Sequence, residues 1–179
     1  MTKNNKENTI KQDKKYFDQN EEVSSDTLVN DQKEEVNDEI RRSELNWLNK
    51  DADCAWVFEI LSHVAASLNA SYFGFELTGF GEPLQLTNYH EARQGTYAWH
   101  QDNGSEGISR KLSMVLQLSN SDNYEGGELQ ILTSKKPVSM QKKRGSITVF
   151  PAWTLHQVTP VIKGTRQSLV AWISGPPFK

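Results

Sequence analysis

Cysteine is almost absent from this sequence of 179 residues, in which Cys54 is the single example. One cysteine excludes a framework of internal disulfides. A thiol without a partner suits a reducing compartment. We therefore expect a cytoplasmic protein that folds without covalent cross-links.

Long apolar runs and a large charge excess are also lacking. No apolar run approaches the roughly 18 residues of a membrane-spanning helix, and the opening MTKNNKENTIKQDKK lacks the apolar core of a secretory signal. The 20 Lys and Arg residues nearly balance the 23 Asp and Glu residues, for a net charge of -3. Electrostatics therefore give no reason to expect nucleic acid or an anionic membrane as a partner. We expect a soluble protein.

The composition divides the chain into a polar tail and one domain. Residues 1–38 are rich in Lys, Asn, Gln, Asp and Glu and contain too few apolar residues to form a core face. Residues 39–179 have the length of one domain. We predict a mobile tail over 1–38 and a folded domain over 39–179.

The domain is predicted to open with a strand and then a helix. The stretch IRRSELNWL at 40–48 alternates roughly between apolar and polar residues, which favours a first strand or an extended lead-in. Asp53 is a suitable cap for the helix that follows. Apolar residues with helical spacing indicate one amphipathic helix: Val57, Ile60, Leu61, Val64 and Leu68.

After the helix the sequence changes to short runs rich in β-branched and aromatic residues. Gly, Pro, Asn or Ser separates these runs, of which there are about eight: FGFEL, LQLTNY, TYAWHQD, RKLSMVLQL, GELQIL, GSITVF, HQVTPVI and RQSLVAWI. A series of this kind is typical of an antiparallel double-sheet fold. We predict a mainly β protein with flanking α, a double-stranded β-helix (jelly roll) packed by one or more helices.

A possible metal site lies in TYAWHQDN. Residues two apart in a strand point to the same side, so His100 and Asp102 should lie together. His156, at the start of a later strand, can come opposite His100 in an antiparallel sheet. Two histidines and one carboxylate hold non-haem Fe(II), although the same set also binds catalytic zinc. His63, on the polar side of the helix, and His90, in a loop after a strand, have no carboxylate at this spacing.

Arg166 supports the iron interpretation. It lies ten residues beyond His156, across an expected turn at Gly164. A 2-oxo acid on the metal would direct its far carboxylate into the protein, and arginine grips a carboxylate with two parallel hydrogen bonds. Ser168, on the same strand face as Arg166, could donate another.

These motifs resemble a known family in the order in which they occur. From about residue 37 to 176, the segments LQLTNY, TYAWHQD, LSMVLQLSNSDNYEGGELQI and GSITVFPAWTLHQVTPVIKGTRQSLVAWI are similar to the prolyl 4-hydroxylase-like branch of the Fe(II)/2-oxoglutarate oxygenases, above all its PKHD-type hydroxylases. The polar tail stands where that family has an opening helix with paired acidic residues.

The resemblance implies a jelly roll that binds Fe(II) through His100, Asp102 and His156. It also implies 2-oxoglutarate and O2 as cosubstrates, with ascorbate as a supporting reductant. Arg166, Ser168 and Tyr89 would bind 2-oxoglutarate. Tyr97 is the rival phenol for the place of Tyr89, which could equally be a core tyrosine.

The expected reaction is hydroxylation of an unactivated C–H bond, with 2-oxoglutarate converted to succinate and CO2. By the same resemblance the substrate is a peptidyl prolyl or similar residue. The alternatives are a hydroxylase of a free amino acid or small metabolite, a non-catalytic cupin-like binding module, or a zinc hydrolase.

Two further features bear on the substrate. Tyr97, Trp99 and Trp153 could line a substrate cleft, although aromatic residues in a β protein are more often core. The basic run at 135–144 could attract an acidic peptide or nucleic acid, but we expect a solvated hairpin loop because it has no interleaved aromatic residues.

Overall fold

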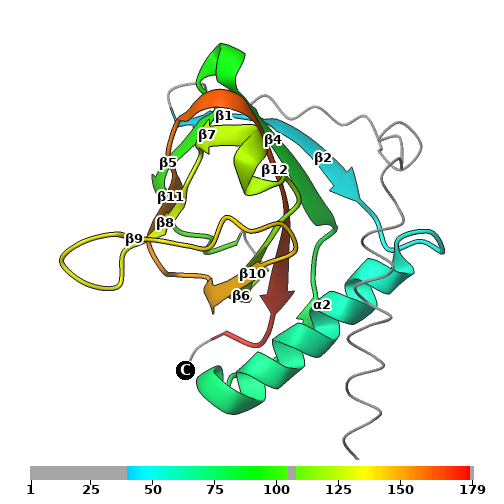
Figure 1. Ribbon diagram of the computed structural model, residues 1–179. Coiled ribbons are helices and arrows are strands. Elements are labelled where there is room, and N and C mark those ends of the chain that lie inside the picture. The colour runs from blue at the N-terminus through cyan, green and yellow to red at the C-terminus, as the bar shows by residue number, and fades with distance from the viewer. Residues whose placement is uncertain (1–39, 105–107, 178–179) are drawn as a thin grey trace, which may run out of the picture.

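The computed structural model of the protein describes residues 40–104 and 108–177. The predicted tail over 1–38 lies outside these residues, so its boundary with the domain stays a prediction. The described chain is two antiparallel β-sheets with one long helix outside them (Figure 1). Within this part, no helix is long and apolar enough to cross a bilayer.

The smaller sheet holds the predicted metal-binding segments. Its strands, in order across the sheet, are β1 (Arg41–Arg42), β5 (Thr96–His100), β11 (His156–Val158), β8 (Leu129–Ile131) and β9 (Val138–Ser139).

The larger sheet forms the opposite wall. Its strands run β10 (Ile147–Pro151), β6 (Arg110–Gln117), β12 (Val161–Ser174), β4 (Leu84–His90) and β2 (Glu44–Leu48), and β12 also pairs with β3 (Gly79–Phe80) and β7 (Tyr124–Gly126). Two 3-10 turns, η2 (Glu91–Arg93) and η3 (Ser121–Asn123), lie between strands. The arrangement confirms the predicted jelly roll.

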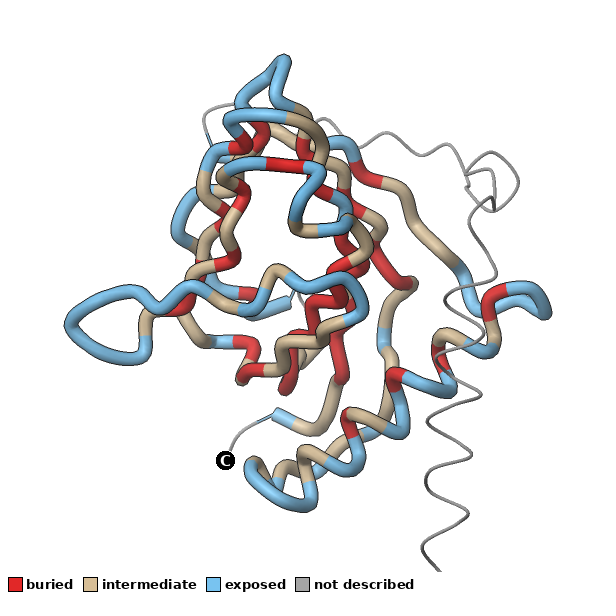
Figure 2. The backbone as a smooth tube through the Cα atoms, in the orientation of Figure 1, coloured by how far each residue is buried: buried red, intermediate tan, exposed pale blue. Residues whose placement is uncertain are grey.

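The larger sheet has two different faces because side chains alternate along a strand. Its outer face packs on the helix α2 (Ala55–Leu68), from which Phe58, Leu61 and Ala65 are buried (Figure 2). The outer-face residues are Leu112, Met114 and Leu116 of β6 with Leu169, Ala171 and Ile173 of β12. The inner face, which looks toward the smaller sheet, carries the polar residues discussed below.

The beginning of α2 differs from the prediction. Its N-cap is Cys54, and the carboxylate of Asp51 accepts the backbone N–H groups of Asp53 and Cys54, at 3.1 and 2.9 Å. The predicted Asp53 cap is therefore wrong by one residue, and the carboxylate that accepts backbone N–H groups at this end belongs to Asp51 in the preceding turn.

The predicted strand FGFEL is also wrong. The helix continues as a π-helical turn, η1 (Asn69–Phe73), and regular pairing resumes only at β3. The side chain of Asn69 accepts the N–H of Phe75 and donates to its carbonyl, both at 2.9 Å. These bonds occupy the backbone groups that a sheet partner would need.

The turn expected at Gly164 does not occur. β12 is one strand from Val161 to Ser174. β11 and the start of β12 both pair antiparallel with the segment 124–131, so the chain passes through residues 159–160 without reversing. Gly164 has a φ of 74°, and a side chain there would collide with the carbonyl of Asn123. Glycine therefore permits close contact with a neighbouring segment, not a reversal.

The first strand and the basic run have more structure than expected. Residues 40–48 form both β1 and β2, so this segment passes from one sheet to the other.

The basic run at 135–144 contains the edge strand β9. Lys142 donates to the carbonyl of Gly126 at 3.2 Å, and its ammonium nitrogen lies 4.3 Å from the centre of the Tyr124 ring.

Candidate metal and cosubstrate site

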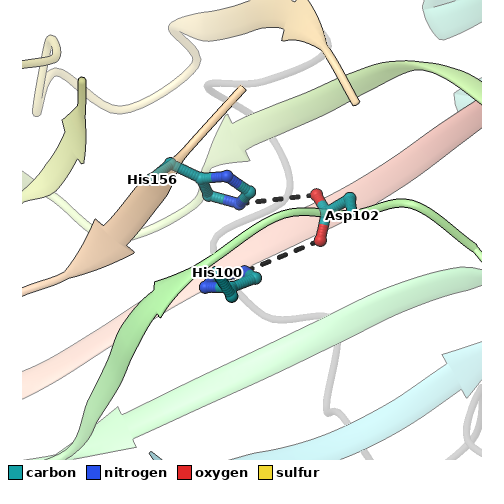
Figure 3. Close-up of side chains that lie close together, drawn as sticks. All are labelled: His100, Asp102 and His156. Atoms are coloured by element: carbon teal, nitrogen blue, oxygen red, sulfur yellow. Dashed lines mark ion pairs between the residues drawn. The ribbon is translucent and has the colours of Figure 1, made fainter. Parts of the chain in front are cut away.

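His100 and His156 lie opposite each other on neighbouring strands. They are register partners between β5 and β11, as predicted. Asp102 follows the end of β5 and is fixed by its N–H, which donates to the carbonyl of Ala152 at 2.8 Å. Although Asp102 lies beyond the strand, its carboxylate turns to the two imidazoles (Figure 3).

The three side chains present one potential ligand atom each at close range. Nε2 of His100 is 3.6 Å from Oδ1 of Asp102, and Nε2 of His156 is 3.4 Å from Oδ2. All three ligand atoms lie within 4.8 Å of one another. This donor set suits a divalent transition metal, Fe(II) among them.

Backbone carbonyls orient both imidazoles. Nδ1 of His100 lies 2.7 Å from the carbonyl of Ala98, and Nδ1 of His156 lies 2.8 Å from that of Thr154. Each Nδ1 therefore carries the proton that it donates, which leaves the Nε2 lone pair for the metal.

The charge states also suit a cation. Burial, together with the nearby His156, lowers the pKa of His100 to about 4, so its ring is neutral at physiological pH. Burial alone would raise the pKa of Asp102, but His156 and the hydroxyl of Ser113 outweigh this effect and hold that pKa well below its usual range. Asp102 is therefore ionised and ready to bind a metal.

Ser113 is a site residue that the sequence reasoning missed. It is fully buried in β6 and donates from Oγ to Oδ2 of Asp102 at 2.7 Å. The signal in RKLSMVLQ was only partial: Ser113 lies between Leu112 and Met114 and so faces away from them, but Val115 on the same face as Ser113 is apolar.

Ser113→Ala is expected to weaken metal binding by about 10-fold, because partners that orient a ligand typically contribute this much. Removing the donor also raises the pKa of Asp102. A titration of the protein with Co2+, followed by absorbance, measures the change. Ser121→Ala, at the surface turn η3, is the control, and an unchanged affinity in Ser113→Ala would show that this hydrogen bond does not orient Asp102.

The residues predicted to bind the cosubstrate line the same cavity as the metal residues. The cavity has a volume of about 340 Å³, and its lining includes His100, Asp102, His156, Arg166, Ser168 and Tyr89. Arg166 and Tyr89 are register partners between β12 and β4, and the guanidinium carbon lies 5.3 Å from the centre of the tyrosine ring.

Arg166 is a buried cation without an acidic partner among the described residues. Its side chain is 1% exposed. Nη1 donates to Oγ of Ser168 at 3.2 Å, whereas Nε and Nη2 have no hydrogen-bond acceptor in this part of the chain. Burial lowers the pKa of the guanidinium, with the phenols of Tyr89 and Tyr124 opposing the shift. A buried cation of this kind is costly unless it is paired, so a bound anion would stabilise it.

Of the other residues considered from the sequence, only Tyr97 lines this cavity. His63 is exposed on α2. His90 is the last residue of β4, not part of a loop, and its ring lies within 3.2 Å of Thr165 and Glu44 side-chain oxygens. Tyr97 lines the cavity, whereas Trp99 and Trp153 do not and are 39% and 40% exposed, so they are not core either.

Comparison with known proteins connects this site to a family. The family model described as the 2OG-Fe(II) oxygenase superfamily matches residues 84–174, about half of the chain. A PKHD-type hydroxylase of Shewanella sp. (strain ANA-3) is 41% identical over 100 residues, which cover 51% of this chain and 44% of the relative. One of Cupriavidus pinatubonensis is 38% identical over 111 residues, covering 59% and 48%.

Solved structures have the same fold. A prolyl-4-hydroxylase of Pseudomonas putida superposes with a TM-score of 0.66 at 20% identity, covering 82% of this chain and 79% of that one. A prolyl hydroxylase of Trichoplax adhaerens, solved with a peptide fragment of hypoxia inducible factor, gives 0.67 at 17% identity, covering 83% and 71%.

The matched region contains β4 to β12. It therefore includes the three candidate metal residues and the three candidate cosubstrate residues, Tyr89, Arg166 and Ser168. The chain spans about half the length of the curated relatives it matches. It belongs to the 2OG-Fe(II) oxygenase superfamily.

Proposed function

We propose that this protein is an Fe(II)- and 2-oxoglutarate-dependent dioxygenase. The observation that carries the proposal is the buried guanidinium of Arg166, which has no acidic partner among the described residues and lines one cavity with His100, Asp102 and His156. A dianion that binds the metal at one end and the guanidinium of Arg166 at the other would pair with the charges at both ends of the cavity. 2-Oxoglutarate is such a dianion.

The protein's own groups have separate tasks. Nε2 of His100, Nε2 of His156 and the carboxylate of Asp102 hold the metal. Arg166 and Ser168 donate hydrogen bonds to the distal carboxylate of 2-oxoglutarate, and Tyr89 supplies its hydroxyl at the same end. Bound Fe(II) supplies the chemistry by which O2 converts 2-oxoglutarate and a substrate C–H group to succinate, CO2 and a C–OH group.

Arg166 also separates this function from the alternatives. A cupin-like binding module or a zinc hydrolase needs the metal ligands but has no use for a buried cation at the far end of the cavity. An unpaired buried charge costs several kcal/mol. A binding partner that recovers this cost explains why the residue lies there.

We further propose that the acceptor is a peptidyl prolyl or similar residue. The names of the relatives support a hydroxylase, and the Trichoplax adhaerens structure contains a peptide. Beyond the metal residues the cavity is lined by groups that could meet a substrate: Arg41, Trp47, Glu82, Arg110 and Trp172. Prolyl peptides and free proline are the first pair of substrates to compare.

Anaerobic addition of Fe(II) and 2-oxoglutarate tests the proposal directly. We expect a weak visible absorption band that appears only when both are present. When O2 is then admitted, succinate should form in proportion to the O2 added. Omitting 2-oxoglutarate is the control for the band. A protein that binds Fe(II) but gives neither band nor succinate would contradict the proposed cosubstrate.

A further inference from the structure

Three side chains form a stack that begins at the metal site. The rings of Tyr97 and His100 are nearly parallel, at 17°, with centres 3.5 Å apart. The guanidinium carbon of Arg41 lies 4.5 Å from the centre of the Tyr97 ring. Arg41 and Tyr97 are register partners between β1 and β5, and both line the cavity.

A β-bulge makes this stack possible. Residues three apart in a regular strand point to opposite faces, so Tyr97 and His100 would not meet. In β5, His100 pairs with His156 and Tyr97 pairs with Val158, so three steps on β5 oppose two on β11. The extra residue in β5 turns Tyr97 to the face of His100, and bulges of this kind re-aim side chains next to active sites.

Arg41 is held firmly on the other side of the stack. Its Nε donates to Oγ of Ser43 at 2.7 Å, and its Nη2 donates to Oε1 of Gln85 at 2.8 Å and lies 3.3 Å from Oγ1 of Thr87. Gln85 and Thr87 are buried in β4, in the larger sheet. The stack therefore connects the larger sheet to a metal ligand in the smaller one.

We propose that Arg41 and Tyr97 are positioning residues that hold the imidazole of His100 in its metal-binding orientation. The bond from Nδ1 to the carbonyl of Ala98 fixes one edge of the ring but allows it to tilt about that edge. The flat face of Tyr97 prevents the tilt, and Arg41 keeps Tyr97 in place through a cation–π contact. The inference rests on the proposed function, since it assigns His100 to the metal.

This role gives Tyr97 a different place from the one considered from the sequence. Its hydroxyl was a rival for the cosubstrate carboxylate, yet the ring lies against His100, and Tyr89 is the tyrosine that is paired with Arg166. The ring of Tyr97, not its hydroxyl, is therefore the part that the metal site requires.

The test is a Co2+ titration without 2-oxoglutarate or Fe(II), followed by absorbance. Tyr97→Leu, which keeps an apolar side chain but loses the flat ring, is expected to weaken Co2+ binding about 10-fold, in the range of partners that orient a metal ligand. Tyr97→Phe should bind like the wild type. Tyr72→Leu, at a position 77% exposed, is the matched surface control.

Arg41→Met tests the same stack from its other end and remains informative if Tyr97→Leu does not fold. We expect weaker Co2+ binding, about 3-fold, and a double variant with Tyr97→Leu that is no weaker than Tyr97→Leu alone, because both changes act through one ring. Melting temperatures without metal report whether each variant is folded.

The failures are distinguishable. Unchanged Co2+ affinity in both folded Tyr97→Leu and Arg41→Met would overturn the positioning role, as would a Tyr97→Phe variant as weak as Tyr97→Leu. A wild-type protein that binds no Co2+ would overturn the metal site itself, and with it the proposed function.

Discussion

Asp102→Ala is expected to remove metal binding almost completely, with a loss of about 100-fold or more. Asp102 supplies the carboxylate of the three-residue cluster, whose ligand atoms lie within 4.8 Å of one another. Residues that merely orient a ligand contribute 10- to 100-fold, so loss of a ligand should reach at least the upper end of this range. Anaerobic Fe(II) titration and succinate formation measure the effect, and His100→Ala should behave in the same way.

Two further variants separate charge from packing. Asp102→Asn retains the size of the side chain and an oxygen that can accept the hydrogen bond from Ser113, but it lacks the negative charge. We expect it to lose most of the affinity as well. His63→Ala, exposed on α2, should leave Fe(II) binding and succinate formation unchanged. Wild-type affinity in Asp102→Ala would exclude this cluster as the metal site.

The close approach of His100, Asp102 and His156 could be predicted because simple rules determine where the three side chains lie. The two-residue spacing of His100 and Asp102 puts them on one side of an extended chain, even though Asp102 proves to lie just past the strand. His156 begins a strand that an antiparallel sheet can place against His100, and the two are register partners. This inference needed only side-chain alternation and antiparallel pairing, and no knowledge of other contacts between distant segments.

Tyr97 could not be placed in this way. The alternation rule puts it on the face opposite His100, and only the bulge in β5 reverses that assignment. A bulge arises from how two strands pair, so the sequence of one strand does not reveal it. The local sequence has no glycine between Tyr97 and His100 to signal the irregularity.

Two errors in the fold have a similar origin. FGFEL has the composition of a strand, but Asn69, four residues before it, binds the backbone of Phe75 and holds it away from the sheet. Gly164 has the conformation of a turn residue, yet it lies within a continuous strand because the neighbouring Asn123 needs the space. In each case a contact overrides the local preference.

The isolation of Arg166 is likewise a property of the fold. The sequence places Arg166 and Ser168 on one face of a strand, and their hydrogen bond agrees with this. Complete burial and the lack of an acceptor for Nε and Nη2 among the described residues depend on how β12, β4 and β7 enclose the side chain. That isolation distinguishes Arg166 from a surface arginine and supports the proposed cosubstrate site.

Arg166→Met is expected to raise the dissociation constant for 2-oxoglutarate by about 30-fold or more. Loss of one partner from a buried, hydrogen-bonded charge pair costs about 2–5 kcal/mol, and about 1.4 kcal/mol corresponds to tenfold. Fe(II) affinity should remain near the wild-type value, because Arg166 does not contact the metal residues' ligand atoms. Titration with 2-oxoglutarate at saturating Fe(II), followed by the absorption band that needs both, measures the first affinity, and a titration with Fe(II) alone measures the second.

The same substitution should stabilise the protein when no ligand is bound. Methionine has a similar length and carries no charge, so it removes a buried cation that lacks an acidic partner among the described residues. Replacement of even a buried ion pair by apolar residues of similar volume is often neutral or stabilises a protein by about 1–4 kcal/mol, and a lone buried cation is less well compensated than a pair. Urea denaturation without metal or cosubstrate therefore should show a higher free energy of unfolding for Arg166→Met than for the wild type.

Arg166→Lys is the matched control, because it keeps the charge but not the planar fork. We expect it to bind 2-oxoglutarate with intermediate affinity and to gain no stability. The opposing signs of the two effects in Arg166→Met are the diagnostic result. If Arg166 had a structural role, its loss would destabilise the protein; if it binds the cosubstrate, the ligand-free protein becomes more stable as the affinity for 2-oxoglutarate falls.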